Sequence, residues 1–267
     1  MTNEPRRRRR APARKPYADT WVVLPTYNEA DNLPEIVPAI LARLPGATLL
    51  VVDDASPDGT GRLADEMAAA DDHVQVLHRR AKQGLGRAYV AGFRRALESG
   101  ADRIVQMDAD WSHHPDYLPT LVGTLGTAEG LSPAGGADLV IGSRYVAGGG
   151  VRNWGPFRRL ISRGGSIFAR TVLSLPAHDL TGGFKAWRRE TVAALPWQEL
   201  HSGGYVFQIE TTYLASRRGA RLAEIPIVFE DRRIGVSKMS RRIIAEALVV
   251  VLRLRWEQFR GRHPRAA

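Results

Sequence analysis

The sequence predicts an α/β fold in which a mainly parallel sheet is covered by helices on both faces. Five short, almost continuously apolar segments have the pattern of strands buried on both sides: WVVLP (21–25), TLLVVDD (48–54), VQVLH (74–78), RIVQMD (103–108) and DLVIGS (138–143). Between them lie segments with helical spacing of apolar residues: 32–44, 60–71, 85–99 and 115–125. Strands that alternate with helices indicate a parallel sheet.

The connections carry the residue types that end strands and begin helices. Asn28 and Asp31 are candidate helix N-caps after the first strand, and Pro57-Asp58-Gly59 predicts a turn before the second helix. Two glycine-rich stretches, 126–137 and 146–156, are expected to be loops. No internal repeat or linker follows residue 17, so residues 18–240 are predicted to form one main domain.

The two ends of the chain differ from this domain. Residues 1–17 form a basic tail: seven Lys and Arg residues within 1–16, against Glu4, supply much of the net charge of +10. Prolines and like charges favour disorder there, with or without contact to a polyanion. Cysteine is absent, which excludes disulfides and thiolate metal sites and is compatible with the cytoplasm.

Residues 241–267 are predicted to form an amphipathic helix and a short tail. The apolar positions recur at helical spacing: Ile243, Ile244, Ala247, Leu248, Val251 and Leu252. Charged residues interrupt the segment at Glu246, Arg253 and Arg255, so it is too short in apolar residues to span a bilayer. Its apolar face either packs on the core or lies on a membrane surface.

Carboxylates at the end of the fourth strand are the first candidate site. Asp108 and Asp110 stand one residue apart in QMDADWSHHP (106–115), where ligands of open parallel sheets bind. Either residue alone could simply cap a helix. Together, oxygen-only ligands favour a hard cation, Mg²⁺ or Mn²⁺, that carries a diphosphate. A zinc site at His113 and His114 is disfavoured because no spaced third ligand accompanies them.

A second cluster of polar residues follows the fifth strand. Guanidinium and ammonium groups that could bind phosphate include Arg144, Arg158, Arg159, Arg163, Arg232 and Lys238. About half are expected to lie on a solvated helix face instead. One anion site with a metal and one lined by arginines imply transfer between two phosphorylated compounds. The segment GGYVFQIE (203–210) is interpreted as a structural helix start, with Gln208 and Glu210 given no role.

The order of these motifs resembles the dolichol-phosphate or polyprenol monophosphomannose synthases. The resemblance covers about residues 20–240 and rests on these segments: PTYNE, VVDDASPDGT, KQGLGRAYVAGF, MDADWSHHP, IGSRY, NWGPFRRLISRG, DLTGGFKAWRRE, GGYVFQIE and DRRIGVSK. Those synthases are family-2 inverting glycosyltransferases with the GT-A nucleotide-diphospho-sugar transferase fold. The resemblance therefore implies this fold and a catalytic domain over 18–240.

The resemblance also implies site roles. Donor binding is expected of Pro25, Tyr27, Glu29, Asp54, Asp108, Ala109, Asp110, Arg232 and Lys238, with Asp108 and Asp110 as ligands of Mg²⁺ or Mn²⁺. The acceptor phosphate is expected at Arg144, Arg158 and Ser162, and the catalytic set is Asp110, Arg144, Arg158 and Arg232. Ser112 departs from relatives that have a ligating Gln there, which puts its role in doubt.

The implied reaction is inverting transfer of mannose from GDP-mannose to a polyprenyl phosphate, giving a β-linked mannosyl phospholipid. It implies an enzyme at the cytoplasmic face of the membrane, attached peripherally or through a membrane-bound partner, and no nucleic-acid partner. Two alternatives remain: a sister enzyme that transfers glucose from UDP-glucose, and a polyanion-binding protein on a degenerate transferase fold. A processive polysaccharide synthase is disfavoured because Leu252 replaces the Gln of the Q-x-x-R-W element.

Overall fold

A computed structural model describes residues 15–126, 136–198, 200, 204, 206–231 and 241–260, with the backbone alone for 241–244. The basic tail up to residue 14 and most of the predicted 126–137 loop lie outside the described residues. So do residues 232–240.

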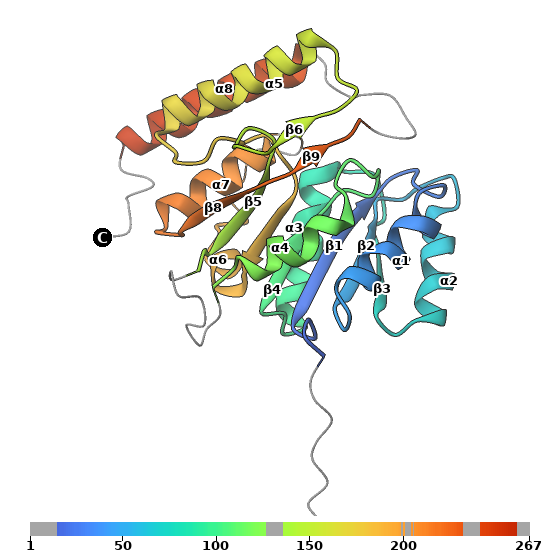
Figure 1. The fold of residues 1–267 in the computed structure, drawn as a ribbon. Coiled ribbons are helices and arrows are strands. Elements are labelled where there is room, and N and C mark those ends of the chain that lie inside the picture. Colours follow the sequence, from blue (N-terminus) through green and yellow to red (C-terminus); the bar gives the residue numbers. More distant parts are fainter. Residues whose placement is uncertain are drawn as a thin grey trace, which may run out of the picture.

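A seven-stranded sheet forms the centre of the molecule (Figure 1). The strand order is β3-β2-β1-β4-β7-β5-β8, and only β7 runs antiparallel to its neighbours. The strands are β1 (Thr20–Thr26), β2 (Thr48–Asp53), β3 (Val74–His78), β4 (Arg103–Gln106), β5 (Leu139–Ser143), β7 (Lys185–Arg188) and β8 (Leu222–Pro226). All five predicted strands are present, so the mainly parallel sheet is confirmed, whereas β7 and β8 were not predicted.

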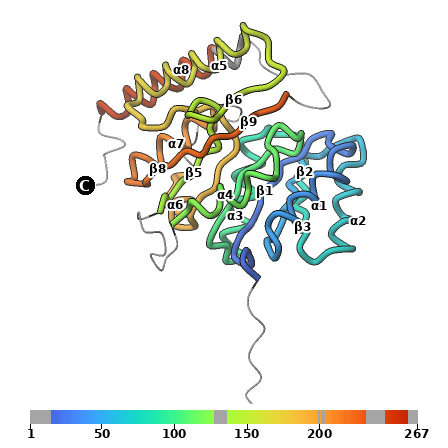
Figure 2. Tube along the Cα trace, in the orientation of Figure 1, coloured from blue at the N-terminus to red at the C-terminus, as the bar shows by residue number. Residues whose placement is uncertain are grey.

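Helices cover both faces of the sheet, and Figure 2 shows the same path as a tube. One face packs against α1 (Leu33–Arg43), α2 (Thr60–Ala70) and α4 (Leu118–Gly123), which follows the 3₁₀ turn η1 (Pro115–Tyr117). The other face packs against α3 (Leu85–Glu98), α5 (Pro156–Leu173), α6 (Arg189–Ala193), α7 (Phe207–Arg217) and α8 (Arg241–Phe259). The sheet therefore separates two apolar cores.

The alternation of side chains along the strands builds these two cores. In β1, Trp21 and Val23 face the α3 side, whereas Val22 and Leu24 face the α1 side. All four side chains are nearly or fully buried, as expected for a strand covered on both faces. The helix α3 approaches β1 closely at Gly92, where an added Cβ would lie 2.3 Å from Val23 Cγ1.

The helices α5 and α8 lie side by side at the edge of the molecule away from β1 to β3 (Figure 1). Beneath them, β6 (Gly150–Val151), which lies inside the predicted 146–156 loop, pairs in parallel with β9 (Val228–Phe229). Among the described residues, no helix is long and apolar enough to cross a membrane.

The apolar residues of α8 do not all pack on the core, which was one of the two arrangements expected for this helix. Val250, Val251 and Leu254 are buried, but Leu248 and Leu252, expected on its apolar face, are 43% and 56% exposed. The reason is that α8 packs on α5 and α7 through a narrow stripe. The amphipathic character of α8 therefore stays a prediction, and its outer surface needs a separate explanation.

Candidate active site

The carboxyl ends of β1, β2 and β4 meet at one edge of the sheet, because these strands are parallel neighbours. After each strand one residue adopts a left-handed backbone: Asn28 (φ 59°), Ala55 (φ 58°) and Trp111 (φ 63°). Such conformations are uncommon for residues other than glycine and turn the chain sharply. The edge is therefore built from tight turns that bring polar side chains out of the sheet.

The residues expected to hold the nucleoside lie together at this edge. Pro25 is buried within β1, and the Tyr27 ring lies under the Lys82 ammonium, which is 3.5 Å from the ring centroid. The Glu29 carboxylate accepts a hydrogen bond from Asn32 Nδ2 at 2.6 Å, and the Glu29 amide donates to Thr60 Oγ1. None of them lines the main pocket described below.

Asp54 has a structural role in the described chain. Its carboxylate accepts hydrogen bonds from the backbone amides of Gln83 and Gly84 and from the Arg79 guanidinium, and the side chain is only 6% exposed. Asp54 thus anchors the loop between β3 and α3. For the predicted contact with the nucleoside, either an Asp54 oxygen accepts a further hydrogen bond or a neighbour such as Arg79 makes the contact.

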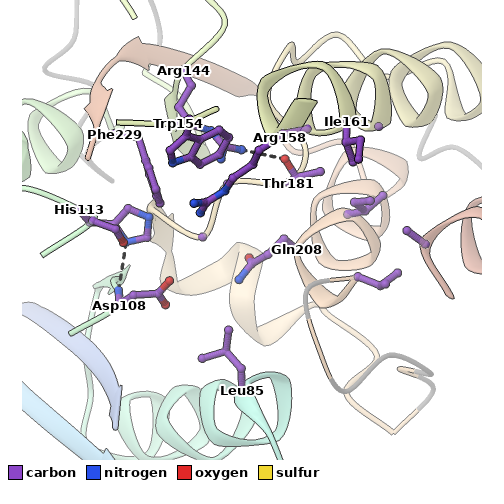
Figure 3. A pocket seen from close by; sticks show the side chains of 18 of the residues that line it. Leu85, Asp108, His113, Arg144, Trp154, Arg158, Ile161, Thr181, Gln208 and Phe229 are labelled. Atoms are coloured by element: carbon purple, nitrogen blue, oxygen red, sulfur yellow. Dashed lines mark hydrogen bonds between the residues drawn. The ribbon is translucent and has the colours of Figure 1, made fainter. Parts of the chain in front are cut away.

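A pocket of about 150 Å³ opens beside this edge, towards α5 and α8 (Figure 3). Its polar lining comes from Asp108, Asp110, Ser112, His113, Arg144, Arg158, Ser162, Thr181 and Gln208. Its apolar lining comes from Leu85, Trp154, Ile161, Phe168, Val206, Ile209, Phe229, Ala247, Leu248 and Val251. The structure thus brings the predicted carboxylates and two of the predicted arginines, Arg144 and Arg158, to one cavity that also has an apolar wall.

The carboxylates at the end of β4 point to this pocket because the strand ends at Gln106, two residues earlier than predicted. Asp110 is 4% exposed, and one of its oxygens accepts the Ser112 amide. Ser112 Oγ is buried and has no hydrogen-bond partner among the described residues. Ala109 differs, because its side chain packs in the apolar core rather than in the pocket.

The donor set at this turn fits a hard divalent cation. Asp108 and Asp110 supply carboxylate oxygens, and the unpartnered Ser112 hydroxyl supplies a further oxygen beside them. The described residues contain no group of three or more His, Asp or Glu side chains that would hold a metal by themselves. Such a cation would therefore need oxygens from a bound ligand, as Mg²⁺ does at phosphates.

Two buried side chains hold Asp108. Tyr89 Oη donates to Asp108 Oδ1 at 2.6 Å, and burial together with the adjacent Asp108 charge raises the pKa of Tyr89 well above its ordinary value. The Asp108 amide donates to His113 Nδ1 at 3.1 Å, and the His113 ring stacks on Phe184. Burial lowers the pKa of His113, so the ring is neutral and accepts this amide.

The predicted Arg144 is held in place by a carboxylate that the sequence analysis left without a role. Arg144 Nε and Nη2 donate to the two oxygens of Asp179 at 2.7 Å each, and the Arg144 amide donates to the same carboxylate. Nη2 also donates to Thr181 Oγ1. Burial by itself would lower the pKa of Arg144, but the Asp179 charge outweighs it and raises that pKa.

The predicted Arg158 stands on the face of Trp154, with its Cζ 4.1 Å from the ring centroid (Figure 3). Its Nη1 donates to Asp231 at 2.6 Å. Arg158 Nε and Trp154 Nε1 are buried N–H donors without a partner among the described residues. Ser162 Oγ lies on the same side and accepts from Tyr145 Oη. Unused donors beside two arginines suit an anion.

Arg232 and Lys238, both expected at the phosphates, lie outside the described residues. Conversely, the pocket contains residues that the sequence analysis missed, above all Trp154 and Gln208. Gln208 was interpreted as structural because a lone amide at a helix start carries no signal by itself. Its partner Lys185, wholly buried in β7, stood within the DLTGGFK motif and offered the one available hint.

The chain is similar in sequence and in fold to known glycosyltransferases. The model of Glycosyl transferase family 2 matches residues 21–195. An undecaprenyl-phosphate mannosyltransferase of Micrococcus luteus is 47% identical over 90% of this chain and 97% of its own length. A polyprenol monophosphomannose synthase of Mycolicibacterium smegmatis is 47% identical over 94% of this chain and 91% of its own length.

Among solved structures, glucosyl-3-phosphoglycerate synthase from Mycobacterium tuberculosis, in complex with Mn²⁺, UDP-glucose and glycerol 3-phosphate, has a TM-score of 0.62 at 21% identity. The match covers 88% of this chain and 79% of that one. This likeness concerns the fold, and it confirms the expected GT-A fold with its mostly parallel sheet flanked by helices. Sheet, pocket and sequence similarity together show that this chain belongs to glycosyl transferase family 2.

Proposed function

We propose that this protein transfers mannose from GDP-mannose to a polyprenyl phosphate and gives a β-linked mannosyl phosphopolyprenol. The relatives that match almost the whole chain at 47% identity are named for the same class of transfer, to undecaprenyl phosphate and to polyprenol phosphate. The guanosine diphosphate donor is the finer part of the proposal, and it rests on the motif resemblance.

The observation that carries the proposal is the composition of the pocket. Carboxylates and arginines line one part of it, whereas Ile161 and Phe168 of α5 and Leu248 and Val251 of α8 line another. A polyprenyl phosphate has the same two parts, an anionic head and an apolar tail. A soluble phosphorylated acceptor would make no use of the apolar wall between α5 and α8.

In the proposed reaction an oxygen of the acceptor phosphate forms a bond to the anomeric carbon of mannose. The bond between that carbon and the donor diphosphate breaks, GDP leaves with the electron pair, and the configuration inverts. Arg144 and Arg158, with Ser162, bind the acceptor phosphate and aim its oxygen at the sugar. Asp179 and Trp154 hold these two arginines in place.

Asp108 and Asp110 would hold a Mg²⁺ or Mn²⁺ ion with the donor diphosphate, and the buried Ser112 hydroxyl would offer a further oxygen beside them. When bound, the ion neutralises the negative charge of the diphosphate. The presence of Mn²⁺ in the structurally similar glucosyl-3-phosphoglycerate synthase supports the use of a divalent ion.

No general base is assigned to the reaction. A phosphate monoester loses its second proton at a pKa of about 6, so the acceptor is already anionic at neutral pH. The pocket agrees with this, because its histidine, His113, is buried and uses Nδ1 to accept the Asp108 amide. The residues need to position two anions rather than remove a proton.

We further propose that α5 and α8 rest on the cytoplasmic surface of the membrane that holds the acceptor. All of the large, exposed hydrophobic side chains in the described part of the chain belong to these two helices: Phe157, Leu160, Ile167, Leu248, Val249, Leu252, Trp256 and Phe259. Arg159, Arg163 and Arg253 on the same helices supply positive charge. An apolar surface with basic residues suits an anionic bilayer.

The transfer is tested with radiolabelled GDP-mannose and a short polyprenyl phosphate in detergent, with divalent ion or with excess chelator. Wild type should form a labelled lipid only with the ion. Asp110→Asn should abolish the product. The matched control is Asp116→Asn, since Asp116 follows in the 3₁₀ turn η1 and pairs with Arg43 on the surface.

Three results would contradict parts of the proposal. Lipid product from UDP-glucose but not from GDP-mannose would show that the donor is wrong and favour the sister enzyme. Full activity in the presence of excess chelator would refute the proposed requirement for a divalent ion. The binding-protein alternative would be favoured if neither sugar is transferred and if the protein binds a polyanion only while residues 1–16 are present.

The membrane surface is tested separately by co-sedimentation with vesicles of phosphatidylcholine, with and without phosphatidylglycerol. Leu252→Ser combined with Trp256→Ser should lose most binding to the anionic vesicles, because both side chains are more than half exposed. Glu66→Ser, exposed on α2, should bind as wild type does. Unchanged binding of the double variant would refute the assignment of this surface.

A further inference from the structure

We propose that Gln208 is a specificity residue whose side-chain amide donates a hydrogen bond to a hydroxyl group of the transferred sugar. This inference rests on the proposed function and deepens it, because it assigns the part of the pocket that receives the sugar. Gln208 lies on α7 and is 2% exposed, yet it lines the pocket.

The orientation of the Gln208 amide follows from its buried neighbours. Its Oε1 accepts from Gln106 Nε2 at 2.6 Å and from Lys185 Nζ at 3.1 Å. Both neighbours donate to this atom, so the oxygen rather than the nitrogen of the Gln208 amide faces Lys185. The Nε2 group is thereby turned to the other side, toward the pocket, where Figure 3 shows the side chain extending toward the Asp108 side.

The lysine behind this amide is fixed as well. Lys185 is wholly buried, and its ammonium also donates to the Gln208 carbonyl at 2.8 Å and to Thr212 Oγ1 at 2.9 Å. Three neutral acceptors surround Lys185 Nζ, and Lys185 is not among the residues that line the pocket. Lys185 is therefore a positioning residue that locks Gln208 from the strand β7 beneath it.

The space in front of the amide is kept open by a glycine. A Cβ built on Gly183 would lie 3.3 Å from Gln208 Nε2 and 3.6 Å from Asp108 Oδ2. Any side chain at this position would fill the gap that these two atoms border. The other oxygen of Asp108 is occupied by Tyr89, so Oδ2 is the one that faces the gap.

A donor and an acceptor that border the same small space suit a ligand group that both donates and accepts. A sugar hydroxyl has this property. A diphosphate offers acceptors only and has no hydrogen to donate to Asp108 Oδ2, and an isoprene unit offers neither a donor nor an acceptor. The gap also lies beside Asp108, where the proposed function places the donor diphosphate to which the sugar is attached. The geometry thus favours the sugar.

The test compares the binding of GDP-mannose with the binding of GDP alone, by calorimetry with the divalent ion that wild type uses. Gln208→Leu should weaken GDP-mannose binding about tenfold, the usual worth of one hydrogen bond, and leave GDP binding unchanged. Monodeoxy analogues of GDP-mannose identify the hydroxyl. One of them should bind wild type about tenfold more weakly and lose nothing further with Gln208→Leu.

Additional variants separate this role from a structural one. Lys185→Met should weaken the same sugar-dependent part of binding, and so should Gly183→Ala, which acts from a different element. Thr211→Val is the matched control, because it removes a buried hydroxyl from the same helix. This hydroxyl donates only to backbone carbonyls of α7. Each variant is first checked by thermal melting.

The proposal is overturned if Gln208→Leu weakens the binding of GDP and of GDP-mannose equally. It is also overturned if GDP-mannose binding is unchanged in Gln208→Leu and likewise unchanged in Gly183→Ala. It is also overturned if every deoxy analogue loses further affinity in Gln208→Leu. Failure of the proposed donor gives a different result: wild type then binds UDP-glucose instead, and the same comparison is made between UDP-glucose and UDP.

Discussion

Removal of the Asp179 carboxylate should destabilise the protein strongly, because the almost completely buried Arg144 guanidinium would lose its ionic partner. The side chains of Arg144 and Asp179 are 5% and 0% exposed, and they share two hydrogen bonds of 2.7 Å. The same carboxylate accepts from the amides of Arg144 and Gly182. Breaking a buried pair on one side costs about 3–5 kcal/mol.

Urea unfolding followed by circular dichroism measures this directly. Asp179→Ala should lower the free energy of unfolding by about 3–5 kcal/mol, which is a large part of the roughly 5–15 kcal/mol typical of a protein. Asp116→Ala is the control, because its pair with Arg43 is about half exposed on both sides and should be worth less than about 1 kcal/mol.

The double variant decides whether the pair itself is responsible. Arg144→Met combined with Asp179→Leu removes both charges and should be more stable than either single variant, since no buried charge is left unpaired. The reasoning is refuted if Asp179→Ala costs no more than the control, or if the two single effects simply add.

Three other predictions concern stability. Gly92→Ala should destabilise by about 1–3 kcal/mol, because its Cβ would overlap Val23, whereas Gly150→Ala, with no atom in reach, should stay within about 0.5 kcal/mol; equal melting temperatures would contradict this. Burial lowers the pKa of Lys185 from 10.5 to about 7, so between pH 7 and pH 10.5 the unfolded chain binds more protons than the folded one. The free energy of unfolding of wild type should therefore rise with pH in this range, by up to about 1.4 kcal/mol per pH unit from this residue. Lys185→Met should lack this contribution in urea titrations, and parallel curves for the two proteins would refute it. Although burial alone would raise the pKa of Asp179, Arg144 and the amides lower it below 3.8, so the gap between wild type and Asp179→Ala should stay constant above about pH 5 and close only below pH 3.8; closure near pH 6 would be inconsistent with the pair.

A mainly parallel sheet covered by helices could be predicted from the sequence because its signals are local, whereas the transferase fold was implied by the resemblance of the motifs. The five apolar segments and the helices between them were readable from residue spacing alone, and parallel strands necessarily place their polar ends at one edge. Asp108 and Asp110 were found for this reason, since they follow the end of a buried strand by a few residues.

The partners of these residues were not readable, because they come from distant parts of the chain. Arg144 meets Asp179 thirty-five positions later, and Gln106 meets Gln208 across 102 positions. The antiparallel strand β7, inserted between β4 and β5, adds Lys185 to the second contact, because it places this residue opposite Gln106 and beside Gln208 of α7. Local patterns carry no information about such an insertion.

The sequence by itself therefore determined five of the strands, the helices between them, their mainly parallel arrangement and the chemical types at the site. The tertiary structure decided which polar groups are free for a ligand. Asp54, which is expected at the nucleoside, also holds a loop through its carboxylate, whereas Gln208 was taken as structural and lines the pocket. The physical reason is that a hydrogen-bonding group becomes available or satisfied only through its neighbours in space, and folding alone assembles those neighbours.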